Sequence, residues 1–166
     1  MKKNPVLVLT GGGTAGHVWP HFALFDAEDS QIKKLFLEKK LDVHYFGSSI
    51  GIEKNLVTQI MPEWNYHSIA TGKLRRYLSF RNITDPLKVI TGFLQTLFLF
   101  FKIKPSCVFS KGGYVSAPVV WAAWILRIPV FIHESDATIA LATKMTLPFC
   151  TKAIFSFPET IQSIPN

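Results

Sequence analysis

The sequence predicts an α/β fold built on a doubly wound parallel sheet. Short apolar runs recur along the chain, and most are followed by segments whose apolar residues have helical spacing. Two of these runs, residues 6–9 and 106–110, lead directly into glycine-rich turns that open a helix. The chain has 166 residues, of which 48% are hydrophobic, so it can bury the core of one domain of ordinary size.

The first half of the chain is expected to alternate strands and helices. After the strand at 6–9, Val18, Phe22 and Phe25 share one helical face. We expect residues 32–40 to form the exposed end of that same helix. A strand at 42–46, a helix at 52–60 and a strand at 64–71 complete this half.

The second half begins with a long apolar helix. Asp85 and Pro86 mark its expected start, because proline is favoured in the first turn of a helix. Its spacing predicts a stripe buried against the sheet, with partial exposure to lipid as the alternative. The stripe consists of Ile90, Phe93, Leu94, Leu97, Phe98 and Phe101. A strand at 106–110, a helix at 119–126, a strand at 129–132 and a short helix near 137–146 follow.

The first glycine turn, residues 10–20, has the sequence TGGGTAGHVWP and is a candidate ligand site. Glycine permits positive φ angles and a close approach of the backbone, and unpaired N–H groups at a helix start attract anions. A phosphate or diphosphate is therefore the expected ligand. His17 lies at the exit of this turn, where it can accept a proton or simply cap the helix or bond a phosphate.

The same turn also satisfies the G-x-G-x-x-G pattern of dinucleotide-binding proteins, through Gly11, Gly13 and Gly16. That pattern requires an acidic residue after the next strand to hold a ribose. The strand at 42–46 is followed by Gly-Ser-Ser instead, so a nicotinamide cofactor is the weaker interpretation. The Walker pattern fails as well, because no Gly-Lys-Ser/Thr closes the turn.

A second glycine turn, KGGYVSAP at 111–118, follows the strand at 106–110. The first and fourth strands of a doubly wound sheet are neighbours, so both turns are expected to open into one crevice. Two adjacent anion sites suit a diphosphate. His133, Glu134 and Asp136 follow the fifth strand at the same edge, where they can orient a substrate, accept a proton or cap a short helix.

The chain carries a net charge of +7, which favours an acidic partner: nucleic acid, an anionic membrane or a phosphate-bearing substrate. Basic and apolar side chains alternate in one segment, namely Lys73, Leu74, Arg75, Arg76, Tyr77, Leu78, Phe80 and Arg81. Such a segment suits the surface of an anionic bilayer, and a solvated loop is the alternative. Nucleic acid is the poorer interpretation, because no nucleic-acid-binding module accompanies the segment.

Several classes of protein are disfavoured by the remaining patterns. The two cysteines, Cys107 and Cys150, form no C-x-x-C pair, so we expect reduced thiols rather than a disulfide framework or a zinc site. No D-x-D motif or spaced His/Asp set predicts a metal cofactor. The apolar run after Lys2 and Lys3 is too short for a secretion signal, and residues 89–103 are expected to be too short to span a bilayer.

Three motifs together give the sequence a resemblance to a known family. GGGTAGHVWP, FSKGGYVSAP and IPVFIHESD resemble the N-terminal domain of the MurG family of bacterial glycosyltransferases, and the similarity extends from about residue 6 to residue 160. This family transfers N-acetylglucosamine (GlcNAc) from UDP-GlcNAc to the 4-hydroxyl of lipid I, the undecaprenyl-diphosphate-linked muramoyl-pentapeptide, and produces lipid II. The resemblance implies a role in peptidoglycan synthesis, and through it in cell wall biogenesis, cell shape and cell division.

The resemblance also implies an architecture and a location. The family has two Rossmann-like domains that face a cleft, the GT-B arrangement. Residues 1–166 correspond to the N-terminal, acceptor-binding half, and the C-terminal donor domain would be missing beyond Asn166. Alone, the chain is expected to be an incomplete enzyme at the cytoplasmic face of the cell membrane, held peripherally through residues 73–81.

Site roles follow from the resemblance residue by residue. Gly12, Gly13, Thr14, Ala15 and Gly16 would line the donor and diphosphate region, although many relatives have glycine in place of Ala15. The acceptor diphosphate would be bound by Lys111, Gly112, Gly113, Tyr114 and Ser116.

The chemistry implied is one inverting displacement at the anomeric carbon, without a metal or other cofactor. His17 would be the general base, with Glu134 as its rival or assistant. His133 and Asp136 would contact substrate, although some relatives have asparagine at the position of Asp136.

Two alternatives belong to other functional classes. The chain could be a non-catalytic, membrane-binding subunit of a split glycosyltransferase that acts on polyprenyl-diphosphate sugars. It could also be a small nucleotide-binding oxidoreductase, for which G-x-G-x-x-G is the sole support.

Overall fold

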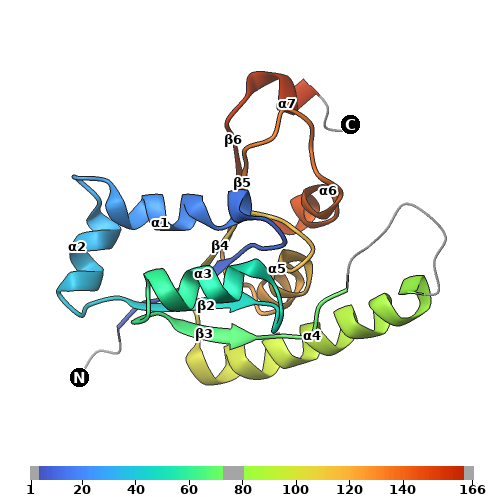
Figure 1. The fold of residues 1–166 in the computed structure, drawn as a ribbon, viewed down its shortest axis with the longest axis horizontal. Coiled ribbons are helices and arrows are strands. Elements are labelled where there is room, and N and C mark those ends of the chain that lie inside the picture. The colour runs from blue at the N-terminus through green and yellow to red at the C-terminus, as the bar shows by residue number, and fades with distance from the viewer. Residues whose placement is uncertain (1–3, 73–80, 163–166) are drawn as a thin grey trace.

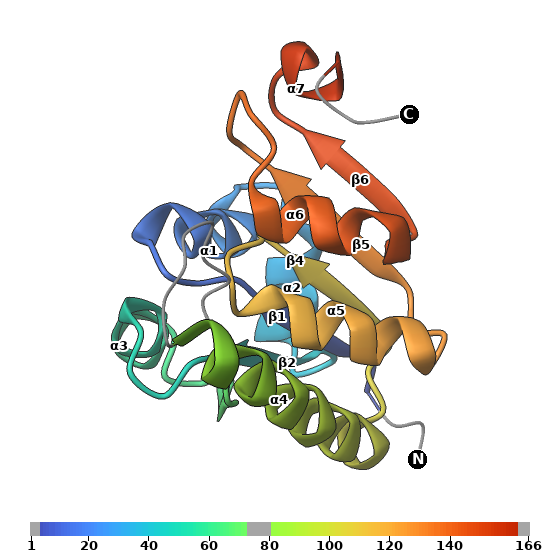
Figure 2. The ribbon, with the colours of Figure 1, turned by 90° about the vertical axis from the view of Figure 1, so that its right-hand side faces the viewer.

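The computed structural model describes residues 4–72 and 81–162, and these form a parallel sheet covered by helices on both faces (Figures 1 and 2). The sheet has six strands in the order β3-β2-β1-β4-β5-β6. The strands are β1 (Val6–Thr10), β2 (Asp42–Gly47), β3 (Asn65–Ser68), β4 (Cys107–Ser110), β5 (Val130–Glu134) and β6 (Lys152–Phe155). All pairs are parallel, which confirms the doubly wound fold that the sequence predicts.

The helices alternate with the strands along the chain. Over the first four strands they are η1 (Ala15–His17), α1 (Trp19–Asp26), α2 (Gln31–Leu37), α3 (Ile52–Ile60) and α4 (Arg81–Ile103). They continue as α5 (Ser116–Ile125), α6 (Leu141–Thr146), η2 (Leu147–Phe149) and α7 (Pro158–Gln162). Thr10 pairs with both Phe46 and Ser110, so β1, β2 and β4 end together at one edge of the sheet.

Each face of the sheet has its own core, because successive residues of a strand point to opposite sides. On one face, Leu9 of β1 shares a core with Phe22 of α1 and Val57 of α3. On the other, Val8 of β1 lies in a core with Phe100 of α4. Figure 2 shows α4 and α5 side by side over this second face.

The segment after α1 corrects one prediction. Residues 32–40 are not the end of the first helix, because α1 ends at Asp26 and a separate helix, α2, begins at Gln31. Ser30 separates the two: its hydroxyl accepts a hydrogen bond from the N–H of Lys33 and donates one to the carbonyl of Leu24. Serine in this capping position favours a new helix start over continuation.

The long helix α4 corrects two more predictions. It begins at Arg81, so Pro86 lies inside it rather than at its start. The predicted stripe is also largely on the wrong side, because Ile90, Leu94, Phe98 and Phe101 are each more than half exposed.

The buried side of α4 is set by small residues. A Cβ at Gly92 would lie 2.0 Å from the carbonyl oxygen of Ala70, so only glycine lets the helix approach that closely. Thr96 is fully buried one turn later, and its hydroxyl donates to the carbonyl of Gly92. Most of the predicted stripe is therefore exposed, as in the alternative that the sequence left open, and is not buried against the sheet.

Helix α4 is also longer than the sequence predicted. Residues 84–103 are long and apolar enough to cross a membrane, with a mean hydropathy of 1.4 in the most apolar window. One such helix is weak evidence for a membrane span, because core helices of soluble proteins meet the same criterion. Val89 and Phe100 of this helix are buried, and Phe100 lies in the core formed with strands of the sheet and α5.

Candidate functional site

The two glycine turns meet at the carboxyl edge of the sheet, as the sequence predicts for neighbouring strands. Gly13, Gly112 and Gly113 have φ angles of 90°, 78° and 78°, which side chains other than glycine rarely adopt. A Cβ at Gly113 would lie 2.2 Å from the carbonyl oxygen of Gly12, and a Cβ at Gly13 would lie 2.8 Å from the ring of Tyr114. The backbones of the two turns are therefore in direct contact.

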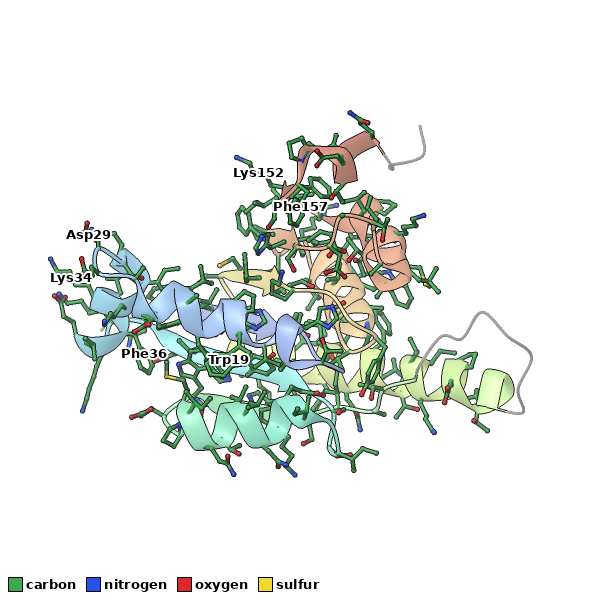
Figure 3. All side chains as sticks on the ribbon, turned by 45° about the horizontal axis from the view of Figure 1, so that its top comes forward. Trp19, Asp29, Lys34, Phe36, Lys152 and Phe157 are labelled. Carbon is green, nitrogen blue, oxygen red and sulfur yellow. The ribbon has the colours of Figure 1, made fainter. Side chains whose placement is uncertain are left out.

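His17 belongs to the first turn, in the short helix η1. Its Nδ1 lies 2.9 Å from the hydroxyl oxygen of Thr14, so this hydrogen bond orients the imidazole. His17 is half-buried, whereas Thr14 and Gly16 are exposed. Trp19 follows at the start of α1 and Phe157 follows β6, and Figure 3 labels both of these side chains. They are 54% and 45% exposed, so large apolar surface flanks this edge of the sheet.

Lys111 lies beneath the second turn with its ammonium group buried. The residue is 1% exposed, and its Nζ has no hydrogen-bond partner among the described residues. Burial lowers the pKa of Lys111, and the nearby carboxylates of Glu134 and Asp136 act in the opposite direction. An ammonium without a partner is costly to bury, so an anion near this turn would compensate its charge.

His21 is a buried neighbour that the sequence analysis missed. It is fully buried, its two ring nitrogens have no hydrogen-bond partner in the described part of the chain, and it packs edge-on to Tyr45 and Phe109. Burial is the main reason that the pKa of His21 is lowered to about 3, and the positive charge of Lys111 is the second. Its spacing in the sequence could have predicted this burial, because His21 lies three residues after Val18 and so falls on the apolar face of the first helix.

Glu134 is held by the backbone that follows it. Its Oε1 accepts hydrogen bonds from the N–H groups of Ser135 and Asp136, at 3.0 and 3.2 Å. Its Oε2 accepts one from Ala140 at 3.4 Å, and the residue is 2% exposed. These bonds shape the loop between β5 and α6. The Nε2 of His133 lies 3.0 Å from the hydroxyl of Ser156, and burial lowers the pKa of His133.

A second residue that the sequence analysis missed is Glu53, at the start of α3. It is fully buried, and its carboxylate accepts a hydrogen bond from the N–H of Gly13 in the first glycine turn. Acidic residues are common in the first turn of any helix, so its sequence position predicts no more than a capping role. In the part of the chain that the structure describes, no group of three or more His, Cys, Asp or Glu side chains could hold a metal ion.

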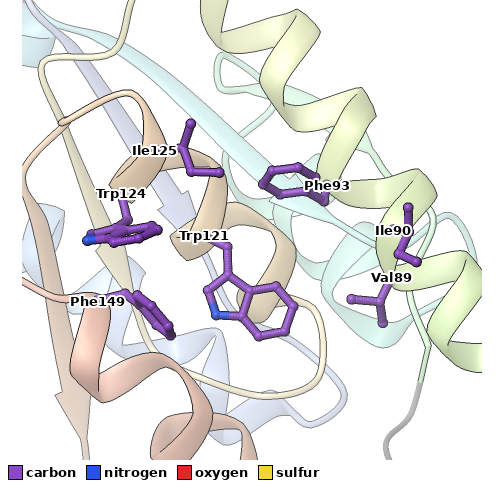
Figure 4. A pocket seen from close by; sticks show the side chains of 7 residues that line it. All are labelled: Val89, Ile90, Phe93, Trp121, Trp124, Ile125 and Phe149. Carbon is purple, nitrogen blue, oxygen red and sulfur yellow. The ribbon is translucent and has the colours of Figure 1, made fainter.

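The basic segment at 73–80 lies outside the described residues, and Arg81 is described only as the first position of α4. Helices α4 and α5, together with Phe149 of η2, line an apolar cavity of about 330 Å³ (Figure 4). The cavity is lined by Val89, Ile90, Phe93, Trp121, Trp124, Ile125 and Phe149. Trp124 and Ile125 are more than half exposed, so the cavity opens onto an apolar surface.

Comparison with known proteins decides the family. Residues 7–155, which span β1 to β6, match the model of the glycosyltransferase family 28 N-terminal domain. The chain belongs to this family. The fold is accordingly the Rossmann-like N-terminal half of a GT-B glycosyltransferase, as the resemblance of the sequence implied.

Two similar proteins carry the same name. A protein of Clostridium kluyveri is 48% identical over 99% of this chain, and one of Oceanobacillus iheyensis is 45% identical over 100% of it. Both are named UDP-N-acetylglucosamine--N-acetylmuramyl-(pentapeptide) pyrophosphoryl-undecaprenol N-acetylglucosamine transferase. The chain covers 43% and 44% of their lengths, so it spans less than half of each relative.

Solved structures share this fold. MurG of Acinetobacter baumannii superposes with a TM-score of 0.73 at 22% identity, over 94% of this chain and 43% of that one. UDP-GlcNAc 2-epimerase of Neisseria meningitidis superposes with a TM-score of 0.57 at 11% identity, over 98% of this chain and 43% of the other. At these identities the likeness concerns the fold alone.

Proposed function

We propose that this chain supplies the acceptor-binding half of an inverting glycosyltransferase. The complete enzyme would transfer GlcNAc from UDP-GlcNAc to the 4-hydroxyl of lipid I and release UDP and lipid II. The observation that carries this proposal is the contact between the two glycine turns, together with the buried ammonium of Lys111, which has no hydrogen-bond partner among the residues that the structure describes. Relatives at 45–48% identity are named for this reaction.

The second glycine turn suits the acceptor diphosphate. Lys111 provides a buried positive charge, and Gly112 and Gly113 allow the backbone to approach a ligand closely. Tyr114 and Ser116 complete this side of the site. Thr14, Ala15 and Gly16 face it from the first turn, where Thr14 and Gly16 are open to the donor.

His17 is the proposed general base. The hydroxyl of Thr14 engages Nδ1, which leaves Nε2 to accept the proton of the acceptor 4-hydroxyl. The acceptor 4-oxygen then bonds to the anomeric carbon of GlcNAc as the bond between that carbon and the diphosphate oxygen of UDP breaks. UDP departs with the electron pair, and the configuration inverts. Glu134 serves by holding the β5–α6 loop, because three backbone N–H groups already occupy its carboxylate.

We propose that residues 1–166 form one acceptor domain, with a separate donor domain as its partner. Their proposed location is the cytoplasmic face of the membrane, bound peripherally. The apolar face of α4 and the cavity beside α5 support this location. Lys102 lies 4.2 Å above the ring of Phe98, so a cation accompanies the apolar face where anionic headgroups would meet it.

A transfer assay tests the proposal. Labelled UDP-GlcNAc and a lipid I analogue are incubated with the chain, with and without the C-terminal half of the C. kluyveri relative. We expect transfer only in the mixture, and its loss in His17→Ala. His67→Ala is the matched control, because it removes an imidazole from β3 and not from the glycine turns.

Two results would contradict this function. Full activity of His17→Ala would remove the proposed base from the chemistry. Absence of transfer from every mixture, with a folded chain that still binds vesicles, would identify a non-catalytic membrane-binding subunit instead.

A further inference from the structure

We infer that Glu53 is a positioning residue that holds the first glycine turn in the shape that receives the diphosphate-bearing ligand. The inference rests on the proposed function, because it concerns the same site. Glu53 lies 40 residues from Gly13 in the sequence and enters the site from α3, on the far side of β2 from the second turn.

The carboxylate of Glu53 joins two separate turns. Its Oε2 accepts a hydrogen bond from Gly13 N–H at 3.2 Å, in the turn after β1. Its Oε1 accepts from the N–H of Ser48 at 3.0 Å and from the hydroxyl of Ser48 at 2.5 Å, in the turn after β2. Hydrogen bonds to a buried carboxylate are stronger than those between neutral groups, so this side chain fixes both turns relative to each other.

Three glycines make room for this side chain. A Cβ at Gly12 would lie 2.6 Å from its Cδ, and a Cβ at Gly51 would lie 2.2 Å from either carboxylate oxygen. A Cβ at Gly47 would lie 3.0 Å from its Cγ and 2.1 Å from the hydroxyl oxygen of Tyr66. Gly12 and Gly51 therefore enclose the carboxylate so tightly that a larger residue at either position would shift it, and Gly47 leaves room for both Glu53 and Tyr66.

The hydrogen bond of Gly13 changes what the first turn can offer a ligand. The carboxylate of Glu53 occupies one N–H that a glycine turn would otherwise present to a phosphate. In return, the turn is held in place before any ligand arrives, which reduces the ordering cost of binding. Gly13 is itself exposed and borders the ring of Tyr114, so a change at Glu53 would be transmitted to the contact between the two turns.

Two tyrosine side chains also donate hydrogen bonds to the backbone of these turns. The hydroxyl of Tyr66 donates to the carbonyl of Ser48, and the hydroxyl of Tyr45 donates to the carbonyl of Gly11, each at 2.7 Å. Burial raises the pKa of both phenols, and the negative charge of Glu53 raises it further. They therefore remain neutral donors that support the same backbone.

The test compares Glu53→Gln with the unmodified chain. Glutamine keeps the size of the side chain, but its amide nitrogen donates, so it cannot accept from Gly13 and Ser48 together. We expect the Gly13 amide to exchange with solvent at least tenfold faster, measured by NMR on the isotope-labelled chain. Inorganic diphosphate, used as the probe, should bind about tenfold more weakly, because the released turn would have to be ordered when the ligand binds.

Controls separate positioning from stability. Glu63→Gln removes the same charge from an exposed position after α3 and should change neither readout. If Glu53→Gln does not fold, Ser48→Ala keeps the carboxylate and removes one donor, and it should accelerate Gly13 exchange by a smaller factor. A folded Glu53→Gln, or Ser48→Ala in its place, with unchanged exchange and affinity would overturn the inference alone. A wild-type chain that binds no diphosphate would overturn it together with the proposed function.

Discussion

Replacing Gly113 with alanine probes the contact between the two glycine turns directly. Alanine would have to adopt a φ of 78°, which costs an L-residue roughly 1–2 kcal/mol. Its Cβ would also lie 2.2 Å from the carbonyl oxygen of Gly12, and that oxygen belongs to a backbone that cannot rotate away. Overpacking of this kind costs about 1–3 kcal/mol.

The free energy of unfolding of Gly113→Ala should therefore fall by about 2–5 kcal/mol. Urea unfolding monitored by tryptophan fluorescence measures this change. If the turns separate to relieve the clash, the loss of stability is smaller, but a displacement of about 1 Å should lower transfer on the order of 100-fold.

Gly16→Ala is the matched comparison for stability. The nearest heavy atom to a Cβ at Gly16 is the hydroxyl oxygen of Thr14 at 3.8 Å, an ordinary contact, so this change should leave the free energy of unfolding nearly unaltered. The reasoning about the contact between the turns is refuted if Gly113→Ala is as stable as Gly16→Ala and equally active in transfer.

Three further changes have outcomes that follow from burial and charge. Lys111→Met should raise the free energy of unfolding by about 1–3 kcal/mol while weakening acceptor binding, because it removes a buried ammonium that has no hydrogen-bond partner in the described part of the chain. Phe98→Ser combined with Phe101→Ser should weaken binding to anionic vesicles at least tenfold, since burying each ring in lipid is worth about 1–2 kcal/mol. His21→Leu should make the fold less sensitive to acid. The pKa of His21 is about 3 in the folded chain, so below pH 6.5 this side chain gains a proton when the chain unfolds. That protonation lowers the free energy of unfolding by about 1.4 kcal/mol per pH unit.

Each of these changes has a comparison that isolates its cause. Lys144→Met removes a charge from an exposed position on α6 and should affect neither stability nor acceptor binding. Phe157→Ser removes an exposed ring far along the chain from α4 and should leave vesicle binding intact. For His21→Leu the measurement is the difference in unfolding free energy between pH 7 and pH 5. His67 keeps part of this dependence, since burial and the neighbouring His44 lower its pKa to about 4. An unchanged difference would show that His21 does not bind the proton.

The local pattern of the sequence was sufficient for five of the six strands and for the glycine turns, but it did not predict β6 (Lys152–Phe155). Four-residue apolar runs such as Val6 to Leu9 have few structural alternatives when a glycine turn follows them. The order of strands followed from the rules of doubly wound sheets, which place the first and fourth strands side by side. The contact between Gly12 and Gly113 was therefore predictable in outline, although its closeness was not.

Helix α4 shows where periodicity fails. Its residues are apolar on nearly every side, so spacing alone could not distinguish the face that meets the sheet from the face that meets solvent. The choice depended on Gly92 and Thr96, whose small side chains let the helix approach β-strand residues and the backbone of Ala70. A pattern that counts apolar residues gives no weight to such positions.

The sequence by itself determined the alternation of the first five strands with helices, the two glycine turns and the histidine that follows the first of them, because these depend on residues adjacent in the chain. The tertiary structure alone decided the partners of Glu53, the burial of Lys111 and His21 and the orientation of α4. Each of these depends on contacts between segments that the chain separates by tens of residues, such as the 40 residues between Gly13 and Glu53. Side chains of this kind acquire their roles from the backbone groups that folding brings to them, which local composition does not encode.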